Sequence, residues 1–144
     1  MRTSIKGKKA LVTGASRGIG KAIVVDLLKN GAEVIGTAKS IQNLENLGNE
    51  LVEHRSQFST IAADLSVNEG VHQLCDTIKN RVGDIDIIVN NAAIFHFELL
   101  ENITDELLEN SFAVNALAPI KICRAFAPAM AEKQWGRIIN VCSS

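Results

Sequence analysis

The chain has 144 residues, of which 47% are hydrophobic, and a formal net charge of −1. This length favours a single domain with a sizeable core, and the near-neutral charge argues against an electrostatic nucleic-acid binder. No long apolar segment follows the basic first residues, so we expect neither a signal peptide nor a membrane span.

Strand-like and helix-like stretches alternate along the chain, which predicts a parallel sheet with helices on both faces. Short apolar runs predict strands at 9–13, 33–38, 58–63, 85–90 and 137–142. Apolar residues at helical spacing and helix-start signals predict helices at 21–30, 41–54, 66–82 and 104–134.

Local signals refine the predicted helices. In the first, Ile19, Ile23 and Leu27 share one stripe, which predicts that this stripe packs on the sheet. Residues 66–69 resemble a capping box, with the serine as the N-cap and the glutamate reaching back. Thr104 is a good N-cap for the last helix.

A glycine-rich turn, Thr-Gly-Ala-Ser-Arg-Gly-Ile-Gly at 13–20, joins the first strand to the first helix. Strand, glycine-rich turn and helix begin a dinucleotide-binding unit, because a helix N-terminus offers unpaired N–H groups to phosphate. Gly14 allows a tight turn, Gly18 lets a pyrophosphate approach, and Gly20 lets the helix pack closely. A plain strand–helix turn is the alternative, and the rest of the pattern favours cofactor binding.

The charges near this turn bear on which cofactor binds. An NAD site usually carries an acidic residue after the second strand, where this chain has Ala38 followed by Lys39. Arg17 lies within the turn itself. Two cations without a carboxylate suit a 2′-phosphate and favour NADP over NAD. The alternative is that Lys39 is a solvated loop charge.

Asn115 lies in the last predicted helix, four residues before Pro119. Proline has no N–H and its ring presses on the carbonyl four residues earlier, so we expect a kink at Asn115. The freed carbonyl could hold a water molecule. The alternative is a buried asparagine that is simply hydrogen-bonded in place.

Four motifs together resemble the short-chain dehydrogenase/reductase family. The turn at 13–20 is similar to the family's TGxxxGxG signature, and 90–93 is similar to its NNAG motif, with Ala93 where glycine is usual. Asn115 occupies the position of the family's catalytic asparagine, and 137–144 resembles the strand that delivers the catalytic serine. The first forty residues are especially similar to bacterial 3-oxoacyl-acyl-carrier-protein reductases.

The resemblance implies an α/β fold, a doubly wound Rossmann sheet of strand order 3-2-1-4-5, with residues 1–144 as an NADP-binding domain that lacks the family's last strands. It places Asp64 and Leu65 against the adenine and 91–93 along the nicotinamide ribose. The implied cofactor-binding residues are Gly14, Ser16, Arg17, Gly18, Ile19, Gly20, Lys39, Asp64, Leu65, Asn91, Ala92 and Ala93.

The resemblance also implies a catalytic machinery that this chain holds only in part. Ser144 would hydrogen-bond the substrate carbonyl, with Ser143 as the alternative, and the main-chain carbonyl of Asn115 would anchor a water in the proton relay. The family's proton donor is a tyrosine in a YxxxK helix, and the chain contains no tyrosine. We therefore expect an NADP-dependent carbonyl reductase whose 144 residues alone are inactive. The alternative is a non-catalytic dinucleotide-binding or subunit-interaction fragment.

The remaining expectations concern partners and minor sites. The resemblance implies a small-molecule or acyl-carrier carbonyl substrate, and it implies that residues 107–130 form a surface for homo-oligomerisation. The histidines and cysteines lack metal-type spacing, so we expect no metal site and a reduced, cytoplasmic setting. Cys75, Cys123 and Cys142 are interpreted as core residues. The apolar residues of 94–97 line a pocket or simply pack.

Overall fold

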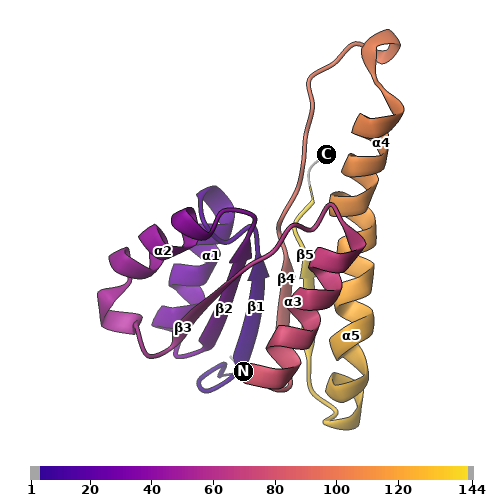
Figure 1. Ribbon diagram of the computed structural model, residues 1–144. Coiled ribbons are helices and arrows are strands. Elements are labelled where there is room, and N and C mark those ends of the chain that lie inside the picture. The colour runs from indigo at the N-terminus through magenta and orange to yellow at the C-terminus, as the bar shows by residue number, and fades with distance from the viewer. Residues whose placement is uncertain (1–3, 143–144) are drawn as a thin grey trace.

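The computed structural model describes residues 4–142, and a sheet of five parallel strands lies at its centre. The strands follow the order β3-β2-β1-β4-β5 (Figure 1), which confirms the predicted order. Their bounds are β1 Lys9–Thr13, β2 Glu33–Ala38, β3 Phe58–Ala62, β4 Ile87–Asn90 and β5 Arg137–Asn140. The first two match the predicted ranges, and the other three are shorter at one end.

Helices cover both faces of this sheet, as predicted (Figure 1). One face packs against α1 (Gly18–Lys29) and α2 (Ile41–Glu50). The other packs against α3 (Asn68–Arg81) and α5 (Ala118–Glu132), and α4 (Asp105–Phe112) precedes α5. The chain is therefore a doubly wound α/β fold.

The alternation of side chains along β1 supplies two separate cores. Leu11 points to the α3 and α5 side, where it is fully buried in one cluster with Ile122. Val12 points to the opposite side and is fully buried in one cluster with Val24 and Leu44. Each such side chain contributes roughly 1.5–3 kcal/mol, so the central strand is held firmly from both faces.

The predicted apolar stripe of α1 is confirmed only in part. Ile23 and Leu27 are partly buried against the core of this face, but Ile19 is 63% exposed. The fully buried positions are Gly20, Val24 and Leu28. The helix begins at Gly18, and Gly20 fits against the glycine turn where no larger residue would. That close approach sets the rotation of the helix, so the neighbouring stripe faces the sheet.

The two predicted N-caps have different outcomes. Thr104 caps α4, because its hydroxyl accepts a hydrogen bond from the Leu107 N–H at 3.2 Å. The capping box at Ser66 is wrong, since α3 begins at Asn68 with no side-chain cap. The Ser66 hydroxyl instead donates to Asp64 Oδ1 at 2.6 Å. A carboxylate two residues away outcompetes the backbone as its partner.

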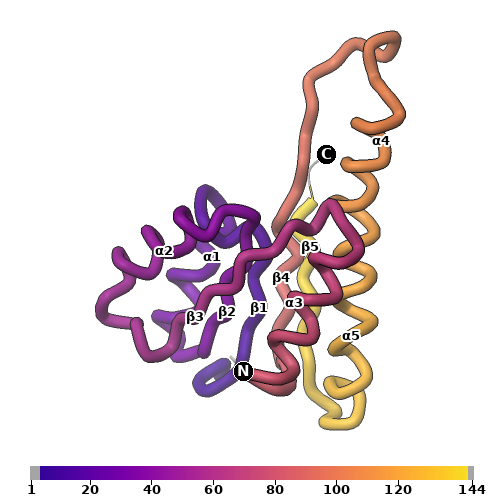
Figure 2. The backbone as a smooth tube through the Cα atoms, viewed as in Figure 1, coloured from indigo at the N-terminus to yellow at the C-terminus, as the bar shows by residue number. Residues whose placement is uncertain are grey.

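The segment between β4 and α4 extends beyond the carboxyl edge of the sheet, and α4 also lies beyond that edge (Figure 2). Phe95 and Phe97 on this segment are 77% and 93% exposed, and their rings meet edge to face with centroids 4.9 Å apart.

Of the three cysteines, Cys75 is buried as predicted and Cys123 is half-buried. Cys142 is exposed, so its assignment to the core is wrong: it follows the edge strand β5, whose residues are exposed.

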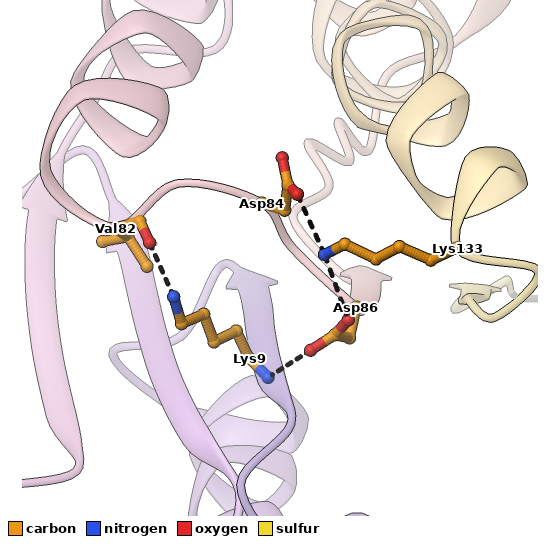
Figure 3. Close-up of polar contacts among 5 residues, drawn as sticks. All are labelled: Lys9, Val82, Asp84, Asp86 and Lys133. Atoms are coloured by element: carbon orange, nitrogen blue, oxygen red, sulfur yellow. Dashed lines mark hydrogen bonds and ion pairs between the residues drawn. The ribbon is translucent and has the colours of Figure 1, made fainter.

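The amino edge of the sheet is closed by a group of charged side chains, which we call the amino-edge clasp (Figure 3). Asp86 Oδ2 accepts a hydrogen bond from the Lys9 N–H at 3.0 Å, and Lys9 Nζ donates to the Val82 carbonyl at 2.7 Å. Lys133 Nζ lies 3.0 Å from Asp84 Oδ2 and 3.7 Å from Asp86 Oδ1. The clasp joins the end of α3, the starts of β1 and β4, and the end of α5.

Candidate functional site

A cavity of about 660 Å³ opens at the carboxyl edge of the sheet, and we call it the carboxyl-edge cavity. It lies where the strand order reverses, between the turns that follow β1 and β4, which is where open α/β sheets bind ligands. All the cofactor residues expected from the sequence line it except Gly20: Gly14, Ser16, Arg17, Gly18, Ile19, Lys39, Asp64, Leu65, Asn91, Ala92 and Ala93.

The glycine turn is shaped by two close approaches. Gly14 has φ +65°, and a Cβ there would lie 2.9 Å from Asn91 Nδ2 and 3.0 Å from Ala92 Cα. A Cβ on Gly20 would lie 2.1 Å from the Gly14 carbonyl oxygen. By contrast, nothing lies within 4 Å of the Cβ position of Gly18, which borders the cavity. The turn is therefore packed on its inner side and open toward the cavity.

Thr13 and Asn91 fasten this turn to the end of β4. The Thr13 hydroxyl accepts hydrogen bonds from the N–H groups of Asn91 and Ala92, both at 3.0 Å. Asn91 Nδ2 donates to the carbonyl oxygens of Thr13 and Gly14 at 3.0 and 3.3 Å. The sequence analysis missed the role of Thr13, although a polar residue that ends a buried apolar strand was a usable signal.

Charged side chains from three turns meet at the cavity. Lys39 Nζ lies 2.7 Å from Asp64 Oδ2, and Asp64 Oδ1 accepts a hydrogen bond from the Ser66 N–H at 3.0 Å. The hydrogen bond from Lys39, followed by that from the Ser66 hydroxyl, lowers the pKa of Asp64 to about 2. Arg17 lines the same cavity and has no ion-pair partner among residues 4–142.

Asn115 ties the long helix to the segment after β4. Its Oδ1 accepts a hydrogen bond from the Ile94 N–H and its Nδ2 donates to the Ile94 carbonyl, both at 2.8 Å. The helix is π-helical over Ala113–Leu117, so it departs from a regular α-helix at Asn115, while the kink expected there stays a prediction. Pro119 follows at once and cannot donate a backbone hydrogen bond. The water on the Asn115 carbonyl stays a prediction.

The end of β5 is fixed beside β4 by a pair of carboxamides. Asn90 Nδ2 donates to Asn140 Oδ1 at 2.9 Å, and the Val141 N–H donates to the Asn90 carbonyl at 2.9 Å. This holds the chain that leads to the two serines at the same edge as the cavity. Ser143 and Ser144 themselves lie outside the described residues.

Within residues 4–142, no three histidine, cysteine or acidic side chains gather as a metal-binding group. Over the same range, no helix has the length and apolar character needed to cross a membrane.

The cavity suits a dinucleotide by several physical criteria. Its volume lies within the range of about 300–1,000 Å³ typical of small-molecule sites. The N-terminus of α1 and the open side of the glycine turn present backbone N–H groups where phosphate would be attracted. Arg17 and Lys39 add positive charge at the same cavity. A phosphate-bearing ligand therefore matches the donors that the chain supplies.

The amino-acid sequence of the chain is similar to those of known proteins. The pattern of the short chain dehydrogenase family matches residues 8–144. The 3-oxoacyl-[acyl-carrier-protein] reductase FabG of Pseudomonas aeruginosa is 37% identical over 140 residues, which are 97% of this chain and 57% of that protein. The uncharacterized oxidoreductase YvrD of Bacillus subtilis is 34% identical over 99% of this chain and 54% of its own length. The chain thus spans little more than half of these relatives.

Solved structures agree with this relation. A metagenomic short-chain oxidoreductase in complex with NADP matches with a TM-score of 0.91 and 36% identity, over 99% of this chain and 65% of that one. The L-sorbose reductase of Gluconobacter frateurii, complexed with NADPH and L-sorbose, matches with a TM-score of 0.89 and 30% identity. That match covers 97% of this chain and 54% of the reductase. Both similar structures are thus complexes with NADP or NADPH.

Proposed function

The chain belongs to the short-chain dehydrogenase/reductase family, and on that premise we propose that its carboxyl-edge cavity binds NADP in an oxidoreductase that reduces a carbonyl group to an alcohol. The observation that carries the proposal is that the glycine turn, Arg17 and Lys39 all line one cavity. The complexes of similar structures with NADP and NADPH support it.

The preference for NADP over NAD rests on charge. The position after β2, where an acidic residue would accept ribose hydroxyls, is occupied by Ala38 and Lys39, and both line the cavity. Arg17 supplies a second cation. A 2′-phosphate would gain from both cations, whereas a 2′-hydroxyl would gain little.

The residues of this chain would divide the work of binding and chemistry. When bound, the cofactor supplies a hydride to the carbonyl carbon. The glycine turn and Arg17 hold phosphate, and Ala92 and Ala93 border the cofactor. Asn115 anchors the segment after β4 through Ile94 and offers its main-chain carbonyl to a relay water. Ser144 donates a hydrogen bond to the substrate carbonyl oxygen, which stabilises the negative charge that develops there.

The 144 residues alone bind the cofactor without turning over substrate. The proton donor that the family resemblance implies is a tyrosine, and the chain has none. General acid catalysis contributes roughly 10²–10⁴-fold to a rate, so its loss leaves negligible turnover. Acyl-carrier thioesters and small ketones are both candidate substrates, since FabG relatives are named for the former and a similar structure holds L-sorbose.

A role in subunit interaction is the second candidate, and a specific surface favours it. Along residues 107–130, apolar side chains face outward: Leu108, Phe112, Leu117 and Ile120 are 46%, 64%, 46% and 62% exposed. A contiguous apolar surface on a helix is typical of a contact between subunits. Homo-oligomerisation through this helix would cover these side chains.

Titration of the purified chain with NADPH and with NADH tests the cofactor proposal. We expect NADPH to bind about tenfold more tightly or better, and Arg17→Ala to reduce that ratio, because one cation contributes on the order of 1.4 kcal/mol to a desolvated phosphate contact. Arg137→Ala, an exposed cation on β5, is the matched control and should leave both affinities unchanged. Equal affinities for the two dinucleotides in every variant would refute the preference for NADP. Robust ketone reduction by the 144 residues would refute their inactivity.

A further inference from the structure

Asp64 is the one carboxylate among the residues that line the carboxyl-edge cavity. It forms an ion pair with Lys39, one of the two cations there. Lys39 Nζ is 2.7 Å from Asp64 Oδ2, while Arg17 has no ion-pair partner within residues 4–142. The pair connects the ends of the neighbouring strands β2 and β3. One of the two cations that the proposed function assigns to the 2′-phosphate, Lys39, is therefore already paired.

The two members of this pair are held very differently. Asp64 Oδ1 accepts hydrogen bonds from both the N–H and the hydroxyl of Ser66, so the carboxylate is fixed by its own turn. The Lys39 side chain is 78% exposed, and within residues 4–142 the carboxylate is its one polar partner. If the pair separates, Lys39 moves and Asp64 stays.

We propose that Lys39 exchanges partners: it is held by Asp64 when no phosphate is near, and it transfers to the 2′-phosphate when NADP binds. The inference rests on the proposed function, because it requires a dinucleotide in this cavity. It gives Asp64 a second task, which is to restrain the cation that distinguishes NADP from NAD.

Charge decides the direction of the exchange. A phosphate monoester carries a charge of about −1.5 to −2 at pH 7 and three acceptor oxygens, whereas Asp64 carries −1 and spends one oxygen on Ser66. An exposed ion pair is weak enough to be replaced by the stronger partner. NAD offers no such partner, so Lys39 remains with Asp64 when NAD binds. The free energy by which the site prefers NADP over NAD then equals the energy that Lys39 gains at the 2′-phosphate minus the energy of the ion pair with Asp64 that is lost.

A double-mutant cycle on the ratio of NADPH to NADH affinity tests this exchange. Lys39→Met should lower the ratio about tenfold through NADPH alone, as expected for one charge-assisted contact. Asp64→Asn should raise the ratio about three- to fivefold, because Lys39 is no longer restrained. In the Lys39→Met background, Asp64→Asn should leave the ratio unchanged. Any contact of Asp64 with adenine affects both dinucleotides equally and cancels in the ratio.

Lys21→Met is the matched control, since Lys21 also forms an ion pair, with Glu50, but does not line the cavity. It should leave the ratio as in the wild type. The exchange is refuted if Asp64→Asn does not raise the ratio, or if it raises it equally without Lys39. Failure of the wild type to bind either dinucleotide would instead refute the proposed function, so the two failures are distinguishable.

Discussion

The two edges of the same sheet use their charges in opposite ways. At the amino edge, Lys133 pairs with Asp84 and Asp86, and Lys9 bonds Asp86 through its N–H and the Val82 carbonyl through its ammonium (Figure 3). At the carboxyl edge, the glycine turn and Arg17 face a cavity of about 660 Å³. The polar groups of the amino edge thus stabilise the fold, whereas the glycine turn and Arg17 at the carboxyl edge are available to a ligand. Substitutions at the two edges should accordingly separate folding from binding.

Gly20→Ala should have the largest effect, because it disrupts the open edge itself. The added Cβ would lie 2.1 Å from the Gly14 carbonyl oxygen, so the turn must shift. We expect a loss of about 3 kcal/mol in the free energy of unfolding, measured by urea denaturation. NADPH binding should weaken by on the order of 100-fold, since displaced backbone donors no longer meet the phosphates.

Gly48→Ala is the control for this substitution. Gly48 also lies within a helix, α2, and nothing is within 4 Å of its Cβ position. Alanine should therefore stabilise the protein by about 0.5–1 kcal/mol through helix propensity, with NADPH affinity unchanged. If both alanine variants gain stability, the close packing assigned to Gly20 is wrong.

Asp86→Ala at the closed edge should reduce stability without changing binding. Asp86 is 9% exposed and accepts the Lys9 N–H, so its removal leaves a poorly solvated donor unpaired. We expect a loss of about 1–3 kcal/mol in the free energy of unfolding. Affinity for NADPH, measured on the folded protein, should stay close to that of the wild type, since Asp86 lies at the opposite edge of the sheet and does not line the cavity.

Lys133→Met provides the comparison within the amino-edge clasp. The Lys133 side chain is 42% exposed, so the removal of its charge should cost less than about 1 kcal/mol. An Asp86→Ala variant that keeps wild-type stability but loses NADPH affinity would contradict the division between the two edges.

The bounds of the strands could be predicted from the sequence because the signals that set them are local and redundant, whereas their order followed from the family resemblance. Both β1 and β2 are apolar runs between turn-forming residues, and their predicted bounds match. Predictions that depend on a choice between partners failed. Ser66 could cap a helix or bond Asp64, and only the folded turn decides. The buried face of α1 likewise depends on how closely Gly20 approaches Gly14.

The candidate site shows the same limit. Its glycines and cations lie at recognisable spacing, and together with the family resemblance they allowed most of the residues that line the cavity to be named in advance. The contacts that shape it connect distant residues, such as Thr13 with Asn91 and Asn115 with Ile94. No spacing in the sequence reports these contacts, because they arise only when the turns after β1 and β4 and the long helix come together in the fold.

The smallest expected effect concerns the ion pair of Lys39 and Asp64 at the carboxyl edge, which contributes little to the stability of the fold. The pKa of Asp64 is lowered from 3.8 to about 2, first by Lys39. Its lowered pKa contributes stability that is complete above pH 3.8 and is lost as the pH falls toward 2. Because Asp64 is about one third exposed and Lys39 largely so, we expect this contribution to be below about 1 kcal/mol.

Urea denaturation of the wild type and of Lys39→Met between pH 2.5 and pH 6 measures this contribution. The wild type should be slightly more stable above pH 4, and the difference should shrink as the pH falls and Asp64 is protonated. A difference that does not vary with pH would mean that Lys39 stabilises the protein through its aliphatic chain rather than through the carboxylate. A difference well above 1 kcal/mol would mean that the pair is too strong for a phosphate to replace, and the carboxyl edge would then resemble the closed amino edge.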